Sequence, residues 1–239
     1  MIRNVATLTH RELAASFLSP VAYIVAAVFL VATGYLFMTN TLVEESEAAI
    51  RPLLDSMAWL LVFAIPLLTM RVLADEFASG TIETLMTAPV TDVEVVAGKF
   101  LGVFLFYIAL LVATLVHVIL VFHYGANDLA VALYGYLGML LIGALYVSVG
   151  VFTSALTRHQ LVAAITGMGL LSVFTLVVDA LASWGGGTWR LVLSYVNVLH
   201  HFEDFSKGIF DTKAIAFFLS STLFFLFLAV KVLESRRWR

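Results

Sequence analysis

The chain has no cysteine, few prolines and little charge. None of its 239 residues is cysteine and only 4 are proline. Without thiols, disulfides, zinc–thiolate centres and cysteine nucleophiles are excluded. Charged residues make up 12% of the chain, about half of the roughly 25% that is usual in soluble domains. The net charge of −3 offers no basic face for nucleic acid. The low charge argues against a soluble globular domain.

Hydrophobic residues are abundant instead. They form 62% of the sequence, and the mean hydropathy is +1.03. A transmembrane helix needs about 20 apolar residues, and the charged residues separate six runs of about that length. No ten-residue stretch alternates with period two, as membrane β-strands do. We therefore predict an all-α polytopic membrane protein, a single transmembrane domain over residues 1–239 with six transmembrane helices. The predicted spans are residues 20–42, 53–72, 98–122, 129–153, 160–182 and 213–233.

Lysine and arginine predict the orientation, because basic residues concentrate in cytoplasmic loops. With the N-terminus inside, nine basic residues fall on the cytoplasmic side and four outside. The outer four are Arg51, Arg190, Lys207 and Lys213. The first apolar run is longer than the 7–15 residues of a signal peptide, so we expect it to be retained. The pattern predicts a multi-pass protein of the bacterial plasma (inner) membrane with both termini in the cytoplasm.

Residues 1–19 have an amphipathic pattern. On a helical wheel, an apolar stripe covers about a third of the circumference; its members are Ile2, Val5, Leu13 and Phe17. Arg11 lies on the far side, and Leu8 does not fit the stripe. The pattern predicts an interfacial helix on the inner membrane surface that ends near Pro20. A frayed tail is the alternative.

A long polar segment joins the second and third spans. Gly80 interrupts it, and residues 81–88 then predict a short helix that Pro89 ends. Thr91 and Glu94 form a capping-box pattern that begins the next helix. Because a short helix is marginally stable alone, either neighbouring loops or a cytoplasmic partner must hold it.

Asp75 and Glu76 precede this short helix. They could pair with Arg71 or cap the bend before Gly80, or they could form a merely solvated acidic turn.

Residues 182–212, between the fifth and sixth spans, are rich in aromatic side chains. Aromatic residues favour the membrane–water interface, so we expect short, re-entrant-like helices half-buried in the outer leaflet. A structural cap over the bundle is the alternative.

Catalytic motifs are missing from the sequence. There is no Walker A, HExxH or GxSxG pattern. The sequence 200–204 is the one cluster that could hold a metal, but His200 and His201 diverge by 100° on a helix, so we predict no metal site and no catalytic residue. A membrane-embedded enzyme is therefore disfavoured.

Small residues recur at four-residue spacing, which lets helices approach closely. The pairs are Gly98-xxx-Gly102, Ala144-xxx-Ser148, Gly150-xxx-Ser154 and Ala163-xxx-Gly167.

Three groups of residues together resemble the ABC-2 type transporter permeases, and among these most closely the gliding-motility-associated branch. The first is Arg71-Val-Leu-Ala-Asp75-Glu76, Gly80-Thr81-Ile82-Glu83-Thr84-Leu85, Ala88-Pro89-Val90 and Gly98-Lys99. The second is Arg11-Glu12-Leu13, Phe17, Ser19-Pro20 and Ala22-Tyr23-Ile24. The third is His201-Phe202, Asp204-Phe205, Lys207-Gly208 and Asp211-Thr212.

The resemblance implies a permease subunit that carries no cofactor itself. ATP and Mg²⁺ would bind a separate ABC ATPase subunit, and a second permease copy or a related permease would complete a dimer. Spans one and five would form the seam, with Ala163-xxx-Gly167 in the contact. An auxiliary envelope subunit and membrane lipids are further expected partners. The residues that the resemblance implies for coupling to the ATPase are Asp75, Glu76, Gly80, Thr81, Ile82, Glu83, Leu85, Met86 and Pro89.

The resemblance also marks Arg11, Glu12 and Phe17 in the interfacial helix. In the outer loop it marks His201, Phe202, Asp204 and Gly208. The leading hypothesis is an ATP-driven permease that moves a substrate outward. The alternative is a non-transporting assembly or anchoring subunit of a cell-envelope or motility complex.

Overall fold

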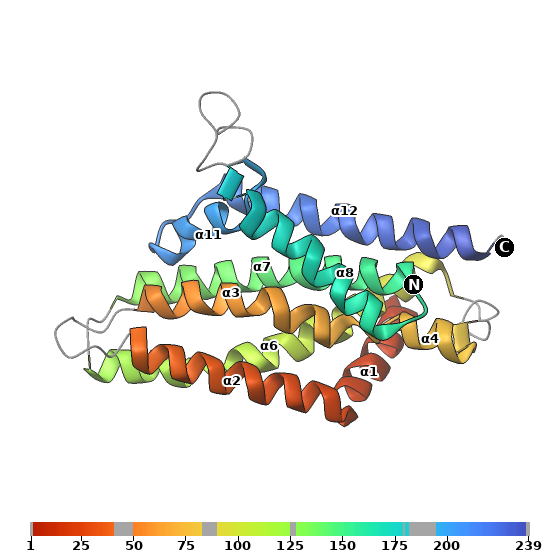
Figure 1. The fold of residues 1–239 in the computed structure, drawn as a ribbon, viewed down its shortest axis with the longest axis horizontal. Helices are drawn as coiled ribbons and strands as arrows, with labels where there is room; N and C mark the ends of the chain where they lie inside the picture. Colours follow the sequence, from red (N-terminus) through yellow and green to blue (C-terminus); the bar gives the residue numbers. More distant parts are fainter. Residues whose placement is uncertain are drawn as a thin grey trace.

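The structure, a computed structural model, is an elongated bundle of helices. It describes residues 2–40, 50–82, 90–124, 128–178, 180–181 and 195–237, and no strand occurs among them. The helices are α1 (Ile2–Leu18), α2 (Pro20–Asn40), α3 (Ile50–Thr69), α4 (Ala74–Ser79), α6 (Asp92–Tyr124), α7 (Leu129–Leu156), α8 (Gln160–Ser172), the π-helix η1 (Val173–Val177), α11 (Val198–Ser206) and α12 (Thr212–Arg237). The end that carries α4 and the chain termini is called the α4 end, and the opposite one the α11 end (Figure 1).

Six helical stretches in the described part of the chain are long and apolar enough to span a membrane. They confirm the predicted all-α polytopic membrane protein. Five of the predicted spans begin within three residues of a helix start, whereas α6 begins at Asp92, before the predicted residue 98. The predicted capping box explains this start: the Thr91 amide donates to Glu94 Oε2 at 2.8 Å, and the Glu94 amide donates to Thr91 Oγ1 at 3.3 Å.

Helix α7 is the centre of the bundle. It contacts α3, α6, α8, α11 and α12, and 72% of its most apolar stretch is buried, against 22% for α12 and 28% for α2. The outward sides of α2 and α12 are apolar; Val31 and Leu223 are among their exposed residues. In a chain that spans a membrane, such faces meet lipid or another membrane protein rather than water.

Small residues allow the close packing around α7. A Cβ atom on Gly143 would clash with the Tyr107 ring, and one on Gly150 with Thr69. The predicted close approach at Gly150-xxx-Ser154 is therefore confirmed.

The pair Ala163-xxx-Gly167 has a different role from the predicted one. Ala163 is buried within the chain, and a Cβ on Gly167 would lie 3.0 Å from Thr153 Oγ1 and 3.2 Å from Pro66 Cβ. These small residues let α8 pack on α3 and α7. The prediction that they contact a second copy was wrong, because their surfaces are already covered inside one chain.

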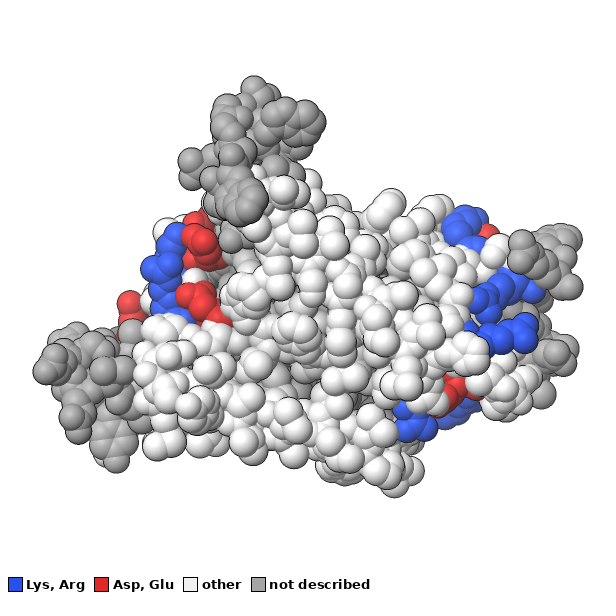
Figure 2. Space-filling view, viewed as in Figure 1, with Lys and Arg blue, Asp and Glu red and all other residues white. Residues whose placement is uncertain are grey.

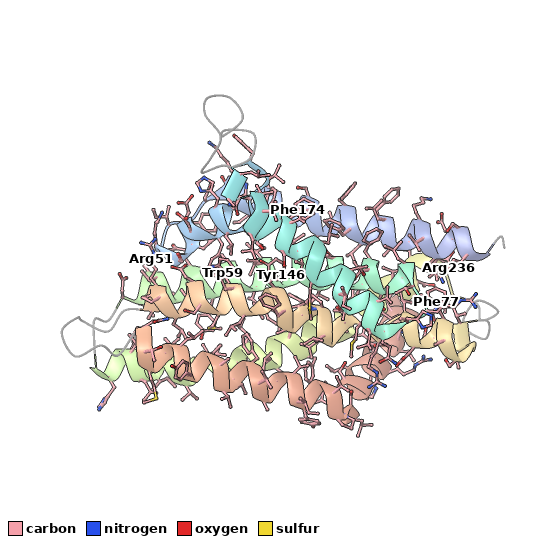
Figure 3. All side chains as sticks on the ribbon, viewed as in Figure 1. Arg51, Trp59, Phe77, Tyr146, Phe174 and Arg236 are labelled. Atoms are coloured by element: carbon pink, nitrogen blue, oxygen red, sulfur yellow. The ribbon has the colours of Figure 1, made fainter. Side chains whose placement is uncertain are left out.

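Charged side chains gather at the two ends of the bundle. Figure 2 shows a wide band without charge between them. Arg51 lies at the α11 end and Arg236 at the α4 end (Figure 3). This division is the one expected when an apolar bundle crosses a bilayer.

Helix α11 confirms a short helix in the loop before the last span; residues 182–194 lie outside the described part. The Asn197 side chain caps it by accepting from the Leu199 amide at 2.9 Å and the His200 amide at 3.3 Å. Phe202 and Phe205 are buried against α7, where a Cβ on Gly138 would lie 2.7 Å from Phe205 Cβ. The expectation that these aromatic rings lie half-buried in lipid was wrong for this helix. Gly138 of α7 has no side chain, and the rings pack into the space that it leaves.

Candidate functional site

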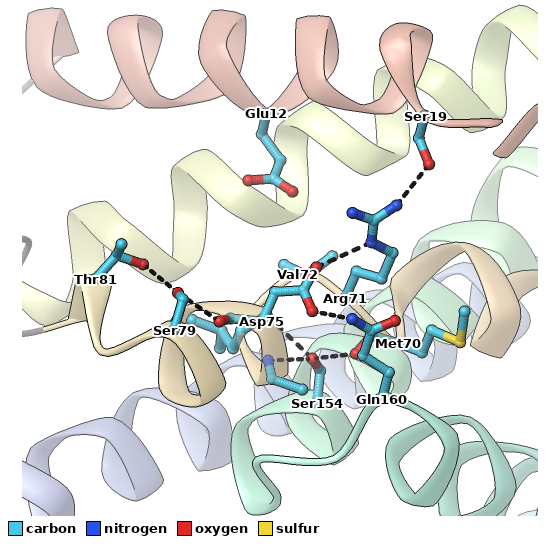
Figure 4. Close-up of polar contacts among 12 residues, drawn as sticks. Glu12, Ser19, Met70, Arg71, Val72, Asp75, Ser79, Thr81, Ser154 and Gln160 are labelled. Atoms are coloured by element: carbon cyan, nitrogen blue, oxygen red, sulfur yellow. Dashed lines mark hydrogen bonds and ion pairs between the residues drawn. The ribbon is translucent and has the colours of Figure 1, made fainter. Parts of the chain in front are cut away.

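The turn between α3 and α4 is held by one serine of α7. Ser154 Oγ accepts hydrogen bonds from the amides of Leu73 and Ala74, both at 3.0 Å, and donates to the Met70 carbonyl at 3.0 Å. These bonds satisfy backbone groups that a helix start leaves without intrahelical partners. Figure 4 shows Ser154 beneath this turn. The start of α4 is therefore fixed to the central helix.

Lys99 of α6 holds the same turn from the other side. Its side chain is 4% exposed, and its Nζ lies 2.6 Å from the Val72 carbonyl oxygen, 3.0 Å from Glu12 Oε2 and 2.9 Å from Glu76 Oε1. An ammonium has three donors, and here each has an acceptor. A buried charge is tolerated only when it is paired in this way.

Arg11 completes a four-residue cluster. Its Nη2 lies 2.8 Å from Glu76 Oε1, so that one carboxylate oxygen receives both Arg11 and Lys99. We call Arg11, Glu12, Glu76 and Lys99 the ion network. It contains two formal positive and two formal negative charges, and it joins α1, α4 and α6.

A second polar group lies beside the ion network. Arg71 Nε donates to Asp75 Oδ2 at 2.9 Å, and Arg71 Nη1 donates to Ser19 Oγ at 2.8 Å, where α1 passes into α2. The other oxygen of Asp75 accepts from Gln160 Nε2 at the start of α8. Figure 4 shows these contacts converging on Asp75. This group adds α2 and α8 to the elements that hold α4.

Two glycines bring α1 close enough to take part. A Cβ on Gly98 would lie 2.5 Å from Leu8 Cβ, and one on Gly102 would lie 2.5 Å from Glu12 Cβ. Leu8, placed off the apolar stripe by the helical wheel, is thus at the contact with α6. That detail of the prediction was wrong. The two glycines of α6 have no side chains, and the groove they leave determines which face of α1 packs against α6.

The end of α12 also reaches α4. The Arg236 guanidinium lies over the Phe77 ring at 4.3 Å from its centroid, and its Nη2 donates to the Leu156 carbonyl at 2.6 Å. Figure 3 shows both labelled side chains at the α4 end. Charged or polar side chains from α1, α6, α7, α8 and α12 therefore fix a helix of six residues.

The site is a junction of paired side chains that joins α4 to the surrounding helices. Its carboxylates are engaged by cations or an amide, and the described residues contain no group of three His, Cys, Asp or Glu side chains that could hold a metal ion.

Comparison with protein families identifies the chain. A family model described as ABC-2 family transporter protein matches residues 6–233. The chain belongs to the ABC-2 transporter family. No curated protein matches it at a significant level. The finer resemblance to the gliding-motility-associated branch stays a prediction.

The structure brings together four of the site residues that were predicted for this ABC-2 permease. Arg11, Glu12 and Glu76 belong to the ion network, and Asp75 lies beside it. Of the alternatives that the sequence left open for Asp75, the structure shows the pair with Arg71. Glu76 does not cap the bend before Gly80, because Arg11 and Lys99 engage its carboxylate.

Other predicted residues are placed less simply. Phe17 packs edge-on against Phe106 of α6 with ring centroids 5.1 Å apart. Gly80 ends α4 with φ +74°, a left-handed conformation that favours glycine, and Thr81 Oγ1 lies 2.9 Å from Ser79 Oγ. Ile82 is buried in the chain's own core. Ile82, predicted among the residues that couple to the ATPase, therefore has apolar contacts with its own chain, and its coupling role stays a prediction.

Some predicted residues lie outside this site. Glu83, Leu85, Met86 and Pro89 fall outside the described residues. The outer-loop set lies at the α11 end: Phe202 in the core, His201 and Asp204 beside an open pocket, and Gly208 in a left-handed turn with φ +78° after α11.

Sequence reasoning missed the roles of Lys99, Ser154 and Gln160. Lys99 was interpreted as the boundary of the third span. A signal was available, since a lysine so close to the start of a long apolar run needs anionic partners. Ser154 and Gln160 carry no comparable signal.

Replacing Gly102 with alanine is expected to lower the free energy of unfolding by about 1–3 kcal/mol, because the new Cβ would overlap Glu12 and force α1 from α6. Gly169→Ala is the matched control, since no atom lies within 4 Å of the position of its Cβ. Thermal unfolding of the purified permease in detergent measures both. Equal melting temperatures for the two variants would contradict this description of the α1–α6 contact.

Proposed function

We propose that this permease moves a substrate outward across the bacterial plasma membrane, using ATP that a separate ABC ATPase hydrolyses. Family membership implies association with such an ATPase. Two permeases would face each other with two ATPases beneath them, and ATP and Mg²⁺ would bind only the ATPase subunits. The substrate would pass between the two permease copies.

The observation that best supports coupling is the fixation of α4. The chain leaves α4 through Thr81 and Ile82 and returns at Val90 to begin α6. A partner that pushed on the intervening segment would act on α4 and α6 together. Because the ion network ties both helices to α1, the displacement would reach the spans instead of being lost in a loose loop.

The α4 end is proposed to face the cytoplasm. The natural chain has no cysteine, so single introduced cysteines can be labelled without background. Glu203→Cys at the α11 end, where the Glu203 side chain is 50% exposed, is expected to react with an impermeant maleimide in intact cells. Ser79→Cys is expected to react only after permeabilisation. Labelling of Ser79→Cys alone in intact cells would reverse the orientation.

Co-purification tests the function itself. An affinity-tagged permease extracted in mild detergent is expected to carry a second protein with a Walker A motif and vanadate-sensitive ATP hydrolysis. Reconstitution of this complex into vesicles is expected to raise its ATPase rate when the transported molecule is present. A complex without an ATP-hydrolysing chain would refute the proposal. An ATPase rate that no fraction of cell extract raises would favour the anchoring role.

A further inference from the structure

An apolar cavity of about 220 Å³ opens on the side of the bundle, between α7, the α8–η1 helix, α11 and α12. Its floor consists of buried side chains that include Leu145, Val149 and Leu171, and Phe224 at its rim is exposed. Phe174 of η1 and Phe225 of α12 lie across it with centroids 6.3 Å apart; Figure 3 labels Phe174. Because the rim belongs to the lipid-facing side of α12, the cavity opens toward the bilayer.

A polar pocket of about 200 Å³ adjoins this cavity at the α11 end. Its lining residues are Tyr195, His200, His201, Asp204, Asp211 and Lys213. The two hollows share one wall: the His201 ring of the pocket stacks on the Phe217 ring of the cavity, with centroids 4.2 Å apart. An apolar cavity and a polar pocket are thus adjacent at the level where a membrane helix meets water.

The charges of the polar pocket are available for a ligand. Neither Asp204 nor Lys213 forms a side-chain ion pair or hydrogen bond with any residue in the described part of the chain, while Asp211 Oδ1 accepts from the Lys213 backbone amide. The acidic and basic residues of the pocket, two carboxylates and one lysine, give a formal charge of −1. The pocket therefore favours a ligand that has an ammonium for the carboxylates and a single anionic group for Lys213.

The extent of the cavity along α12 suits an acyl chain. Phe217 and Phe225 both line it, and the eight-residue step from one to the other along a helix rises about 12 Å. Half of the hydrocarbon core of a bilayer is about 15 Å thick. One chain of a phospholipid fits this length, and its headgroup would reach the polar pocket.

We propose that these two hollows bind one phospholipid with an ammonium-bearing zwitterionic headgroup, of the phosphatidylethanolamine type. One acyl chain occupies the apolar cavity, the ammonium faces Asp204 and Asp211, and the phosphate faces Lys213. The site does not depend on the proposed transport function, because it is complete within one chain and involves no ATPase.

Native mass spectrometry of the purified permease tests the proposal. The protein is released from nanodiscs of equal parts phosphatidylethanolamine and phosphatidylglycerol, and the retained lipids are counted by headgroup. One lipid per chain is expected, with phosphatidylethanolamine favoured by about fivefold, the contribution of one exposed charge contact. Equal retention of both headgroups would overturn the assignment.

Two pairs of variants locate the site. Ser221 lines the cavity, whereas its neighbour Ser220 does not. Ser221→Phe is expected to lower lipid retention about tenfold, the equivalent of two lost methylene contacts, while Ser220→Phe retains the lipid. Asp204→Lys is expected to shift the preference to phosphatidylglycerol, while Glu203→Lys, outside the pocket, leaves it unchanged. The same retention by both serine variants, or the same headgroup ratio in both lysine variants, would refute the site. If Ser221→Phe does not fold, the comparison of Asp204→Lys with Glu203→Lys still tests the proposal.

Discussion

Replacing Lys99 with methionine is expected to lower the free energy of unfolding by about 3–5 kcal/mol. The substitution removes the cation from between Glu12 and Glu76 and leaves one buried and one partly buried carboxylate near each other. It also leaves the Val72 carbonyl without its donor. Breaking a buried ion pair by removing one partner has an effect of this size. Thermal or denaturant unfolding of the detergent-solubilised permease measures it.

Two comparisons isolate the cause. Lys231→Met makes the same substitution in a largely exposed pair with Glu234 and is expected to cost at most about 1 kcal/mol. The triple variant Glu12→Gln, Glu76→Gln, Lys99→Met also neutralises the two carboxylates that Lys99 pairs with. It should therefore recover most of the stability that Lys99→Met loses. If Lys99→Met and Lys231→Met unfold alike, Lys99 is not the buried centre of the ion network.

The membrane spans could be predicted from the sequence because their signal is strong and local. In a bilayer, a run of about 20 apolar residues must satisfy its backbone hydrogen bonds internally, which a transmembrane helix does. The capping box at Thr91 and Glu94 predicted where α6 begins, whereas the apolar run alone was bounded near Lys99, and the role of that lysine was missed. A lysine can lie inside a helix when two carboxylates from other helices meet it, and no single segment of sequence contains that information.

The packing of α1 could not be derived from its own sequence. The helical wheel weighs only the residues of one helix, and so it discarded Leu8. The face of α1 that packs is determined by Gly98 and Gly102 on α6, because these glycines have no side chains and so form a groove for α1. Small-residue spacing likewise indicated that Ala163 and Gly167 make a close contact but not with which helix.

Reversing the charge of Glu83 is expected to weaken binding of the ATPase about thirtyfold or more. The sequence predicts a helix over residues 81–88, and at 100° per residue Glu83 lies 200° from Thr81. Ile82 faces the core of the permease, and Glu83 lies 100° away from it on the same wheel, so Glu83 is directed to the side of that core contact, where a partner could meet it. Loss of an interfacial charge pair costs about 2 kcal/mol or more, which corresponds to this factor.

Glu234→Arg provides the matched control for Glu83→Arg. Glu234 is an exposed acid of α12 at the same end of the bundle, and its partner Lys231 belongs to the same helix. Titration of each purified variant with the ATPase should show weaker binding and a lower stimulated ATPase rate for Glu83→Arg alone. Membrane insertion should be the same for both, since the segment lies between the spans. Leu85→Asp is a second test at a residue that the resemblance implies for coupling; because Leu85 lies 60° from Ile82 on the wheel, the melting temperature of this variant is measured as well. Unchanged affinity in both Glu83→Arg and Leu85→Asp would show that the ATPase acts on the permease through another surface, and the ion network around α4 would then be a structural support for the bundle.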